Sequence, residues 1–527
     1  MATLQFRGKS AVWNHHLSVP YHTLEKDAKK SLKGTDAEEN LIIEGDNLLA
    51  LKSLLPKYQG RVKCIYIDPP YNTGNEGWVY SDNVNSPLLR EWMGKVVGKE
   101  NEDLTRHDKW LCMMTPRLKL LRELLSEDGV IFVSIDDNEG AHLKSLMDDI
   151  FGENNFVANI VWQKKYAASN DATGIPAMHD YITVYQKTDK FERQLLPRTE
   201  KQDAAYKNDD DDGKGPWRSD NLLVKTFSES AVFPITNPNT GKKFLPKKGN
   251  SWRANQETVN RWLAEGRIFF GKDGKGAPQL KRYLHEVQQG IVPVTWWTYE
   301  DAGHNDQANK ELQELFGKER VPFETPKPTK LVKRLLQIAT KKDDIVLDSF
   351  AGSGTTAHSV LDLNKEDSGT RKFILVEMED YANNITAERV RRAAKKCGYK
   401  AGFTYYNLGS AIDAESILTG KLPTYKEFAK YVYYLATGKN HPVEKKIKEE
   451  DSFVGKTDHQ SVYLLYEKNA DALKKLAITL DWAQKTHAKD KNKKIVYAPA
   501  CYLDDEALEH FNIKFVSIPY NLFERAV

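Results

Sequence analysis

Short apolar runs alternate with helical patterns in two separate blocks of the chain, and this alternation limits the possible folds most. In the first block, residues 41–44, 61–68 and 130–136 have the apolar composition of buried strands. In the second block, residues 344–348 and 372–377 have it too. Helical stretches separate these runs, among them one at 109–127 that Gly129 should end. Strands that alternate with helices predict an α/β fold built on a mostly parallel sheet.

The two blocks are separated by a long stretch in which the rhythm fades and glycine, proline, lysine and aromatic residues crowd together. It is longer than ordinary loops, so we expect it to be functional. The predicted organisation is a polar N-terminal segment with only short structure (1–40), the first half of an α/β domain (41–187), an insert (188–325), the second half (326–404) and a small C-terminal α/β domain (405–527).

Composition excludes several classes of protein. The formal charge is only +3, from 77 basic and 74 acidic residues, so any nucleic-acid surface must be a local patch. No apolar run is long enough for a membrane helix, and the first residues do not resemble a secretory signal. The 4 cysteines form no CxxC pair, which argues against a zinc ribbon or a disulfide framework. We therefore expect a protein of the reducing cytoplasm without a metal centre.

The first chemical motif is Asp68-Pro69-Pro70-Tyr71-Asn72, directly after the predicted strand 62–67. Ligands of open α/β sheets bind beyond the carboxyl ends of the strands. Prolines fix the backbone and lack N–H donors, so we expect both proline carbonyls and the Asp68 carboxylate to face a pocket as acceptors. Such acceptors would help an exocyclic amine to become pyramidal, and Tyr71 could stack on a flat base. The alternative is a turn with a capping aspartate.

The second motif, DSFAGSG (348–354), follows the predicted strand 344–347. Its glycines permit a tight turn and a close approach of the backbone to a ligand, although a plain strand–helix turn is an equally good reading of the motif alone. Glu377 ends the next strand, 23 positions after Gly354, where an acid binds ribose hydroxyls in dinucleotide folds. Ala357 stands where a third glycine would be, so a nucleoside without a pyrophosphate fits better.

In this order, around a long insert, the two motifs resemble the permuted β-group of DNA amino-methyltransferases, in particular the modification (Mod) subunits of type III restriction–modification systems. The matching blocks include EGDNLLALKSL, IYIDPPYNTG, HDKWLCMMTPRLKLLRELL, GVIFVSIDDNE, NIVWQKK, HDYITVY, KPTKLVKRLL, DSFAGSGTTAHSV and FILVEM. They cover residues 41–190 and 325–395. The resemblance implies a Rossmann-like, circularly permuted methyltransferase domain that uses S-adenosylmethionine, with an inserted target-recognition domain.

Carried over residue by residue, the resemblance makes four residues catalytic: Asp68, Pro69, Pro70 and Tyr71. It implies contacts with S-adenosylmethionine for Asp46, Lys327, Thr329, Asp348, Phe350, Gly352, Gly354 and Glu377. Asp348 would face the methionine end of the cofactor, Glu377 its ribose and Asp46 its adenine. Residues 327–329 would lie beside its carboxylate. For Asp46, capping of the following helix is the alternative.

The insert 188–325 would be the target-recognition region. Its candidate phosphate contacts are Arg218, Lys247, Lys248, Arg253 and Arg261. Its tryptophans suit groove reading, although core packing explains any single one better: Trp217, Trp252, Trp262, Trp296 and Trp297. Residues 73–108 are predicted to form a lid over the pocket.

The resemblance also implies a reaction and partners. We expect a site-specific methyltransferase that transfers a methyl group to adenine N6 in double-stranded DNA, after the base has been flipped out of the helix. It should form a homodimer in the cytoplasm of a bacterium or archaeon, associated with the nucleoid. The sequence has no GxxxxGK[ST] motif, so restriction would require a separate subunit with helicase and nuclease domains.

Three alternatives stay open. A cytosine-N4 DNA methyltransferase would use the same chemistry, but such relatives more often have Ser at the position of Asp68. Methyltransferases of RNA or of a protein glutamine amide usually have Asn there and place the glycine motif first. A non-catalytic DNA-binding assembly subunit could keep the fold, although intact Asp68 and Tyr71 argue against it.

Overall fold

The computed structural model describes residues 3–73, 105–168, 174–317, 323, 325–412, 416, 422–439, 441, 447, 449–450 and 452–518. The chain divides into two compact units, one formed by residues 1–194 and 294–527 and the other by residues 195–293.

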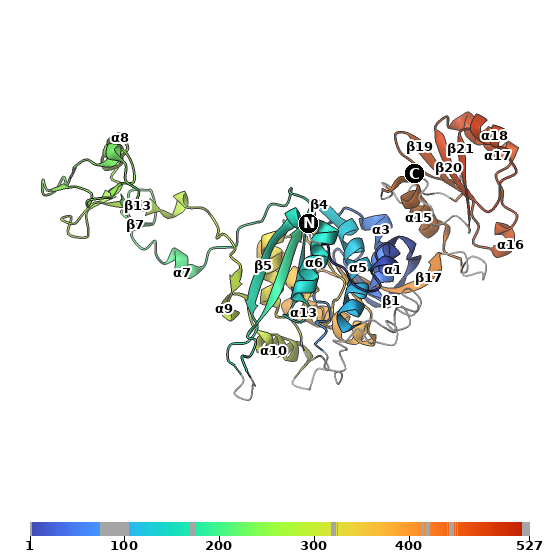
Figure 1. Ribbon diagram of the computed structural model, residues 1–527, viewed down its shortest axis with the longest axis horizontal. Coiled ribbons are helices and arrows are strands. Elements are labelled where there is room, and N and C mark those ends of the chain that lie inside the picture. Colours follow the sequence, from blue (N-terminus) through green and yellow to red (C-terminus); the bar gives the residue numbers. More distant parts are fainter. Residues whose placement is uncertain are drawn as a thin grey trace. The chain divides into compact units, whose positions relative to one another are not determined.

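A ten-stranded sheet forms the centre of the first unit (Figure 1). Its strand order is β1 (Tyr21–Leu32), β17 (Phe403–Ile412), β2 (Leu41–Glu44), β16 (Lys372–Glu377), β15 (Ile345–Asp348), β3 (Val62–Ile67), β4 (Leu125–Ile135), β6 (His179–Gln186), β5 (Phe156–Gln163) and β14 (Trp296–Trp297). Neighbours from β17 to β4 run parallel, as do β5 and β14, whereas β1 and β6 are antiparallel to their neighbours. The predicted α/β class is confirmed.

Helices cover this sheet because its central strands are apolar on both faces. On β3, Ile65 and Ile67 join the core that includes α3 (Asn47–Tyr58), α5 (Arg106–Leu124) and α6 (Gly140–Phe151). The alternate residues Cys64 and Tyr66 are equally buried, on the face that α11 packs against. Further helices of this part, among the residues that the structure describes, include α1 (Lys9–Val12), α2 (His15–Ser18), α9 (Tyr299–Ala302), α10 (Asn305–Phe316), α11 (Thr329–Ala339), α12 (Thr355–Asp367), the π-helical turn η6 (Asn383–Ala387) and α13 (Glu388–Cys397).

Residues 425–518 of the first unit contain a second, smaller sheet, and one of its two core clusters extends to Tyr21 of β1 and Ile412 of β17. Its strand order is β18 (Phe453–Lys456), β19 (Gln460–Leu464), β20 (Lys493–Ala498) and β21 (Ile513–Ser517). Its helices are α15 (Tyr425–Thr437), α16 (Ala470–Leu473), α17 (Leu480–Lys489) and α18 (Asp505–His510). Thr424 and Glu427 form a capping box that begins α15.

The second unit, residues 195–293, lies inside the predicted insert 188–325. It has a small core around Leu222, Trp252 and Val259. Its elements are α7 (Glu200–Asp203), α8 (Gln256–Ala264), a sheet of β12 (Ile268–Phe269), β13 (Gln279–Tyr283) and β7 (Trp217–Asn221), and the pairs β8 (Leu223–Val224) with β11 (Ser251–Trp252) and β9 (Ile235–Thr236) with β10 (Lys243–Phe244). Residues 294–317 instead belong to the first unit, where β14 extends the main sheet.

Two predicted elements differ from the structure. The N-terminal segment contains a twelve-residue strand, β1, which pairs with β17 at the sheet edge. The helix predicted at 109–127 ends at Leu124, and β4 begins at Leu125 and runs through Gly129, so that glycine does not end the helix. No helix among the residues that the structure describes is long and apolar enough to cross a membrane.

Candidate active site

Four acidic residues of the two motif regions lie at one edge of the main sheet. The strands β2, β16, β15 and β3 are parallel neighbours, and Asp46, Glu377, Asp348 and Asp68 lie at or just beyond their carboxyl ends. This edge is where open α/β sheets bind ligands. Folding therefore brings together the DPPY motif and the glycine motif, although the insert separates them in sequence.

Lys327 links the two motifs. Its Nζ lies 2.5 Å from Asp68 Oδ2 and 5.1 Å from the centre of the Tyr71 ring. Its carbonyl accepts a hydrogen bond of 3.0 Å from the Thr355 hydroxyl, at the start of α12. Asp68 Oδ1 is buried and accepts no hydrogen bond of good geometry from the residues that the structure describes. The Tyr71 side chain lies beside Asp68, and burial and that carboxylate together raise the pKa of Tyr71.

One of the two proline carbonyls is not a free acceptor. The indole Nε1 of Trp110 donates a hydrogen bond of 2.7 Å to the Pro70 carbonyl. The Trp110 ring is fully buried in α5, and a buried indole N–H needs an acceptor. One lone pair of the Pro70 carbonyl is therefore already engaged, and that both proline carbonyls face the pocket stays a prediction. Trp110 instead fixes the end of the motif to α5, a role that the motif alone does not reveal.

Asn72 ends the motif in the left-handed backbone region, with φ of 58°. Its side-chain amide donates to the Arg106 carbonyl at 3.1 Å and to the carboxylate of Glu139. Asparagine tolerates this conformation better than most residues. The motif is thus tied to the start of α5 and to the residue that precedes α6.

Besides Asp68, the acid Asp180 lies near the DPPY motif. It is buried at the start of β6, with its Oδ1 2.5 Å from Lys164 Nζ. Burial raises the pKa of Asp180. The positive charges of Lys164 and Lys327 lower this pKa, whereas the negative charge of Asp68 raises it further. Because β6 runs antiparallel to β4, its first residues lie at the edge where β4 ends. The antiparallel direction of β6 is what places Asp180 at this edge, and the sequence alone does not give that direction.

Asp348 is buried and holds the glycine loop in shape. Its Oδ1 accepts from the Phe350 amide at 3.0 Å, and its Oδ2 accepts from the Thr356 hydroxyl at 2.5 Å. Burial nevertheless raises the pKa of Asp348 to about 7. Phe350, the next predicted cofactor residue, is half-buried against the main core.

Glu377 supports the same loop from the end of β16. Its Oε2 accepts a hydrogen bond of 2.7 Å from the Gly352 amide, and its Oε1 accepts from the Met378 and Glu379 amides at 2.9 and 3.1 Å. Burial raises the pKa of Glu377 to about 7 although these N–H groups favour the charged form. A ribose hydroxyl would therefore bind a carboxylate that the backbone already orients.

A side chain at Gly352 and one at Gly354 would meet different obstacles. Both have positive φ, 52° at Gly352 and 80° at Gly354. A Cβ at Gly354 would lie 2.7 Å from the Thr386 carbonyl oxygen, so this residue permits packing against η6. A Cβ at Gly352 would lie 3.0 Å from the Phe323 ring.

A buried arginine that the sequence analysis did not find lies beneath the loop. Nη1 of Arg389 donates to the Ser353 and Thr355 hydroxyls at 2.8 and 2.7 Å. Burial lowers the pKa of Arg389 to about 10. Arg389 follows η6 on α13, outside both motifs, so only the fold places it there.

The remaining predicted cofactor residues have partners within the chain. Asp46 caps α3 through the Leu48 and Leu49 amides, and its Oδ2 lies 3.6 Å from the buried Arg117. The capping that was the alternative for Asp46 is therefore present. The amide and hydroxyl of Thr329 both donate to Glu311 at 3.0 Å, at the start of α11.

The candidate DNA contacts lie mostly on the surface of the second unit. Arg253 pairs with Asp220 at 2.9 Å, and Arg261 with Glu265 at 3.9 Å. Lys247 and Lys248 are exposed. The remaining candidate, Arg218, is half-buried and has its guanidinium 5.4 Å from the Tyr206 ring centre.

The tryptophans divide in the same way: Trp217, Trp252 and Trp297 are buried, Trp262 is half-buried and Trp296 is exposed. Core packing therefore explains three of the five. The predicted lid, 73–108, lies mainly outside the described residues.

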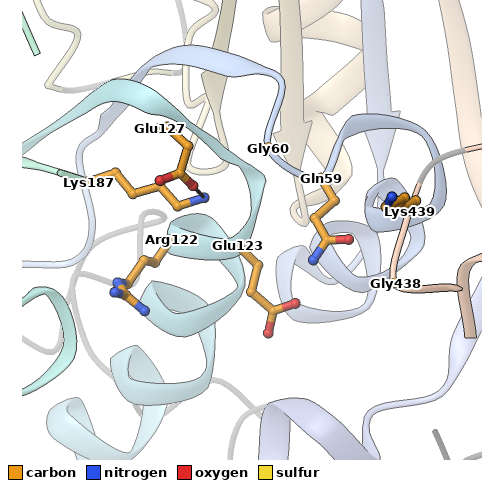
Figure 2. A pocket seen from close by; sticks show the side chains of 8 residues that line it. All are labelled: Gln59, Gly60, Arg122, Glu123, Glu127, Lys187, Gly438 and Lys439. Carbon is orange, nitrogen blue, oxygen red and sulfur yellow. Dashed lines mark ion pairs between the residues drawn. The ribbon is translucent and has the colours of Figure 1, made fainter. Parts of the chain in front are cut away.

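A cavity of about 570 Å³ lies elsewhere in the first unit (Figure 2). It is lined by Gln59, Gly60, Arg122, Glu123, Glu127, Lys187, Gly438 and Lys439. Lys187 and Glu127 form an ion pair of 3.2 Å across it (Figure 2). None of the predicted catalytic or cofactor residues lines this cavity, so it is separate from the candidate active site.

Comparison with known proteins identifies the family of the chain. Residues 62–388 match the family model for DNA methylases of the N6/N4 type. The chain is 39% identical over 374 residues to the StyLTI Mod subunit of a type III restriction–modification enzyme from Salmonella typhimurium, an alignment that covers 68% of this chain and 54% of the relative. It is 33% identical to the EcoP15I Mod subunit from Escherichia coli, with 70% and 65% covered.

A shorter relative is covered more fully. The type II methyltransferase M.KpnI from Klebsiella pneumoniae is 31% identical over 399 residues, which are 72% of this chain and 87% of that protein. The chain thus spans about half to two thirds of the length of the two Mod subunits and most of M.KpnI. The matched region contains the DPPY motif, the glycine motif and Lys327, and the chain therefore belongs to the family of N6/N4 DNA methylases.

Proposed function

We propose that this protein transfers a methyl group from S-adenosylmethionine to N6 of adenine in double-stranded DNA, as the modification subunit of a restriction–modification system. The observation that supports this most is the position of the Asp68 motif and the Gly352 loop on the neighbouring parallel strands β3 and β15, joined by the ion pair of Lys327 with Asp68.

The glycine loop fits S-adenosylmethionine. Gly352 presents its backbone where Glu377, a carboxylate suited to ribose hydroxyls, is already oriented. Ala357 stands where the third glycine of a pyrophosphate-binding loop would be. This fits a nucleoside cofactor that has no phosphates. The bound cofactor would supply an electrophilic methyl group. Asp46, Lys327, Thr329, Asp348, Phe350 and Gly354 complete the proposed cofactor site.

The Asp68 motif would orient the amine of the base. Asp68 Oδ2 is paired with Lys327, so Oδ1 is the oxygen that can accept a hydrogen bond from the amine. With Pro70 occupied by Trp110, the Pro69 carbonyl is the proposed second acceptor. The two acceptors would favour the pyramidal nitrogen that attacks the methyl group. Tyr71 would stack on the flipped base.

The second unit would recognise the DNA target. Besides Lys247 and Lys248 it exposes further lysines, namely Lys225, Lys242, Lys243, Lys272 and Lys275. Exposed lysines suit phosphate contacts, which position a protein on DNA without reading sequence. In this proposal residues 188–325 are the target-recognition insert, between the halves 41–187 and 326–404 of one permuted methyltransferase domain.

The partners would be those of a modification subunit. Two relatives are named as Mod subunits of type III enzymes, which supports a separate restriction subunit as partner. We further propose that the protein forms a homodimer to which residues 405–527 contribute. This dimer would act on the nucleoid in a prokaryotic cytoplasm. Light scattering tests the dimer: a particle of 60.1 kDa, with and without DNA, would contradict it.

Methyl transfer from labelled S-adenosylmethionine to a mixture of DNA, RNA and protein tests the proposed substrate. Label should enter only the DNA fraction, and it should disappear after DNase treatment but not after RNase or protease treatment. Label in RNA or protein would contradict the proposal, and so would a folded chain that binds the cofactor and transfers nothing.

A further inference from the structure

Two histidines and a glutamate converge beside the catalytic motif. Glu139 precedes α6, His142 lies in its first turn, and His107 lies at the start of α5. His107 Nδ1 is 2.8 Å from Glu139 Oε1, and His142 Nδ1 is 2.9 Å from Glu139 Oε2. The Glu139 side chain is fully buried, while the two imidazoles remain about a third exposed, at 34% and 38%.

Only one of these two close contacts is a hydrogen bond. His107 Nδ1 and Glu139 Oε1 have acceptable geometry. His142 Nδ1 and Glu139 Oε2 are both buried atoms that lack a hydrogen-bond partner among the described residues, although they face each other at 2.9 Å. Two buried polar atoms that converge without a hydrogen bond are rare, and an ion between them is one explanation.

The donor set fits a transition-metal ion. Two imidazole nitrogens and one carboxylate are the protein ligands of many catalytic zinc sites, which keep the fourth position open. Around Zn²⁺, with ligand bonds of about 2.0–2.1 Å, neighbouring donors lie about 3.3 Å apart. All three donor groups lie within 4.8 Å of one another, so small side-chain rotations would give this geometry.

We propose that His107, Glu139 and His142 bind one divalent transition-metal ion of the Zn²⁺ class. The exposed edges of the two imidazoles leave room for water as a further ligand. Binding through Nδ1 of His107 requires its ring proton on Nε2, which gives up the weak contact of 3.4 Å from Arg106 Nε. Sequence spacing does not reveal this site, because His107 lies in α5 whereas Glu139 and His142 lie at the start of α6.

The site would fix the catalytic motif. The Asn72 side chain donates to Glu139 and to the carbonyl of Arg106, the neighbour of His107. An ion that holds Glu139 between the two helices would therefore hold the end of the DPPY motif as well. Outer partners of this kind commonly orient ligands and change metal affinity.

A second group of possible ligands is less suited. His358, Asp362 and Cys397 also lie close together, but the Tyr399 hydroxyl already donates to Asp362. His358 is buried, and its Nε2 lies 3.8 Å from Asp362. Cys397 therefore provides a matched control for the proposed site.

Metal titration of the full chain tests the inference. The protein is stripped with EDTA, incubated with ZnCl₂ and passed through a desalting column, and bound zinc is measured by mass spectrometry. Co²⁺ in place of Zn²⁺ reports the ligand geometry through its visible absorption. We expect one ion per chain, and an affinity at least about tenfold weaker in His142→Gln and His107→Gln.

Two variants serve as controls, Cys397→Ser and the exposed His459→Gln, and both should keep the wild-type stoichiometry. Circular dichroism establishes that each variant is folded, and Glu139→Gln replaces any histidine variant that is not. Failure of the folded wild-type chain to retain Zn²⁺ would overturn the proposal. Equal retention by folded His142→Gln, or loss in Cys397→Ser, would overturn it as well.

Discussion

At the scale of single residues, the glycine loop depends on one backbone conformation at Gly352. Gly352→Val would put a branched side chain at φ of 52° and against the Phe323 ring. Backbone strain of this kind costs on the order of 1–3 kcal/mol, so cofactor affinity should fall roughly tenfold or more. Calorimetry with S-adenosylmethionine measures it.

The control is Gly398→Val, at φ of 68° with no atom within 4 Å of a Cβ. It imposes similar strain away from the loop and should leave the cofactor affinity unchanged. Unchanged affinity in Gly352→Val would remove this loop from the cofactor site.

Burial of Asp348 and Glu377 predicts a pH dependence of stability. Burial raises the pKa of each to about 7, while in an unfolded chain their pKa is about 3.9 and 4.3. Between these values the folded protein binds more protons than the unfolded chain. The contribution of the two protonated carboxyl groups to the free energy of unfolding is therefore complete below about pH 4, and it is lost as pH rises through about 7.

Urea unfolding at pH 5 and pH 8 measures this dependence, and Asp348→Asn isolates one group. The wild-type chain should lose more free energy of unfolding between the two pH values than the Asn variant does. An equal loss in both proteins would show that Asp348 does not titrate as its burial predicts.

At the scale of elements, α5 positions the proposed catalytic motif through the hydrogen bond from Trp110 to Pro70. Trp110→Phe removes the hydrogen bond to Pro70, worth about 0.5–1.5 kcal/mol. The methylation rate should fall about two- to tenfold while cofactor affinity stays unchanged, because the glycine loop is not touched. Single-turnover kinetics and calorimetry separate the two effects.

Trp162→Phe is the matched control, since this buried indole donates a similar bond of 2.9 Å to the Gly303 carbonyl. Its rate should remain close to that of the wild type. If both variants lose the same rate, the effect is general destabilisation and Trp110 has no special role.

Elements were predictable where the local pattern is strong. β3, β15 and β16 are short apolar runs with an acid at or just after the end, so the same pattern predicted the strands correctly and placed three proposed site acids at one edge of the sheet. β1 was not predictable, because this edge strand has mostly exposed or half-buried side chains and lacks an apolar pattern. Trp110 and Arg389 act on the motifs from other elements, so only the tertiary structure places them.

At the scale of the whole molecule, the second unit should determine which DNA sequence is methylated. Replacing residues 195–293, which form a unit with its own core, by the corresponding region of a relative should change the methylated motif and keep the base. Single-molecule sequencing of DNA from cells that express the chimaera reports both. An unchanged motif would place recognition elsewhere, for example in residues 405–527.

The domain organisation was less predictable than the motifs. The loss of alternating strand and helix patterns indicated the region of the insert. However, residues 294–317 of the predicted insert form β14, α9 and α10 in the first unit. β14 has only two residues, and its parallel pairing with β5 is a long-range contact that no local pattern encodes.

Mass spectrometry of nucleosides from DNA incubated with the protein and labelled S-adenosylmethionine tests the central claim most directly. The wild-type chain should produce labelled N6-methyladenine. Asp68→Ala should produce it about 100- to 1000-fold more slowly, because one preorganised acceptor is lost. Asp343→Ala, an exposed acid before β15 at the opposite edge of the sheet, should match the wild type. Labelled N4-methylcytosine without N6-methyladenine, or a wild-type rate in Asp68→Ala, would contradict the account.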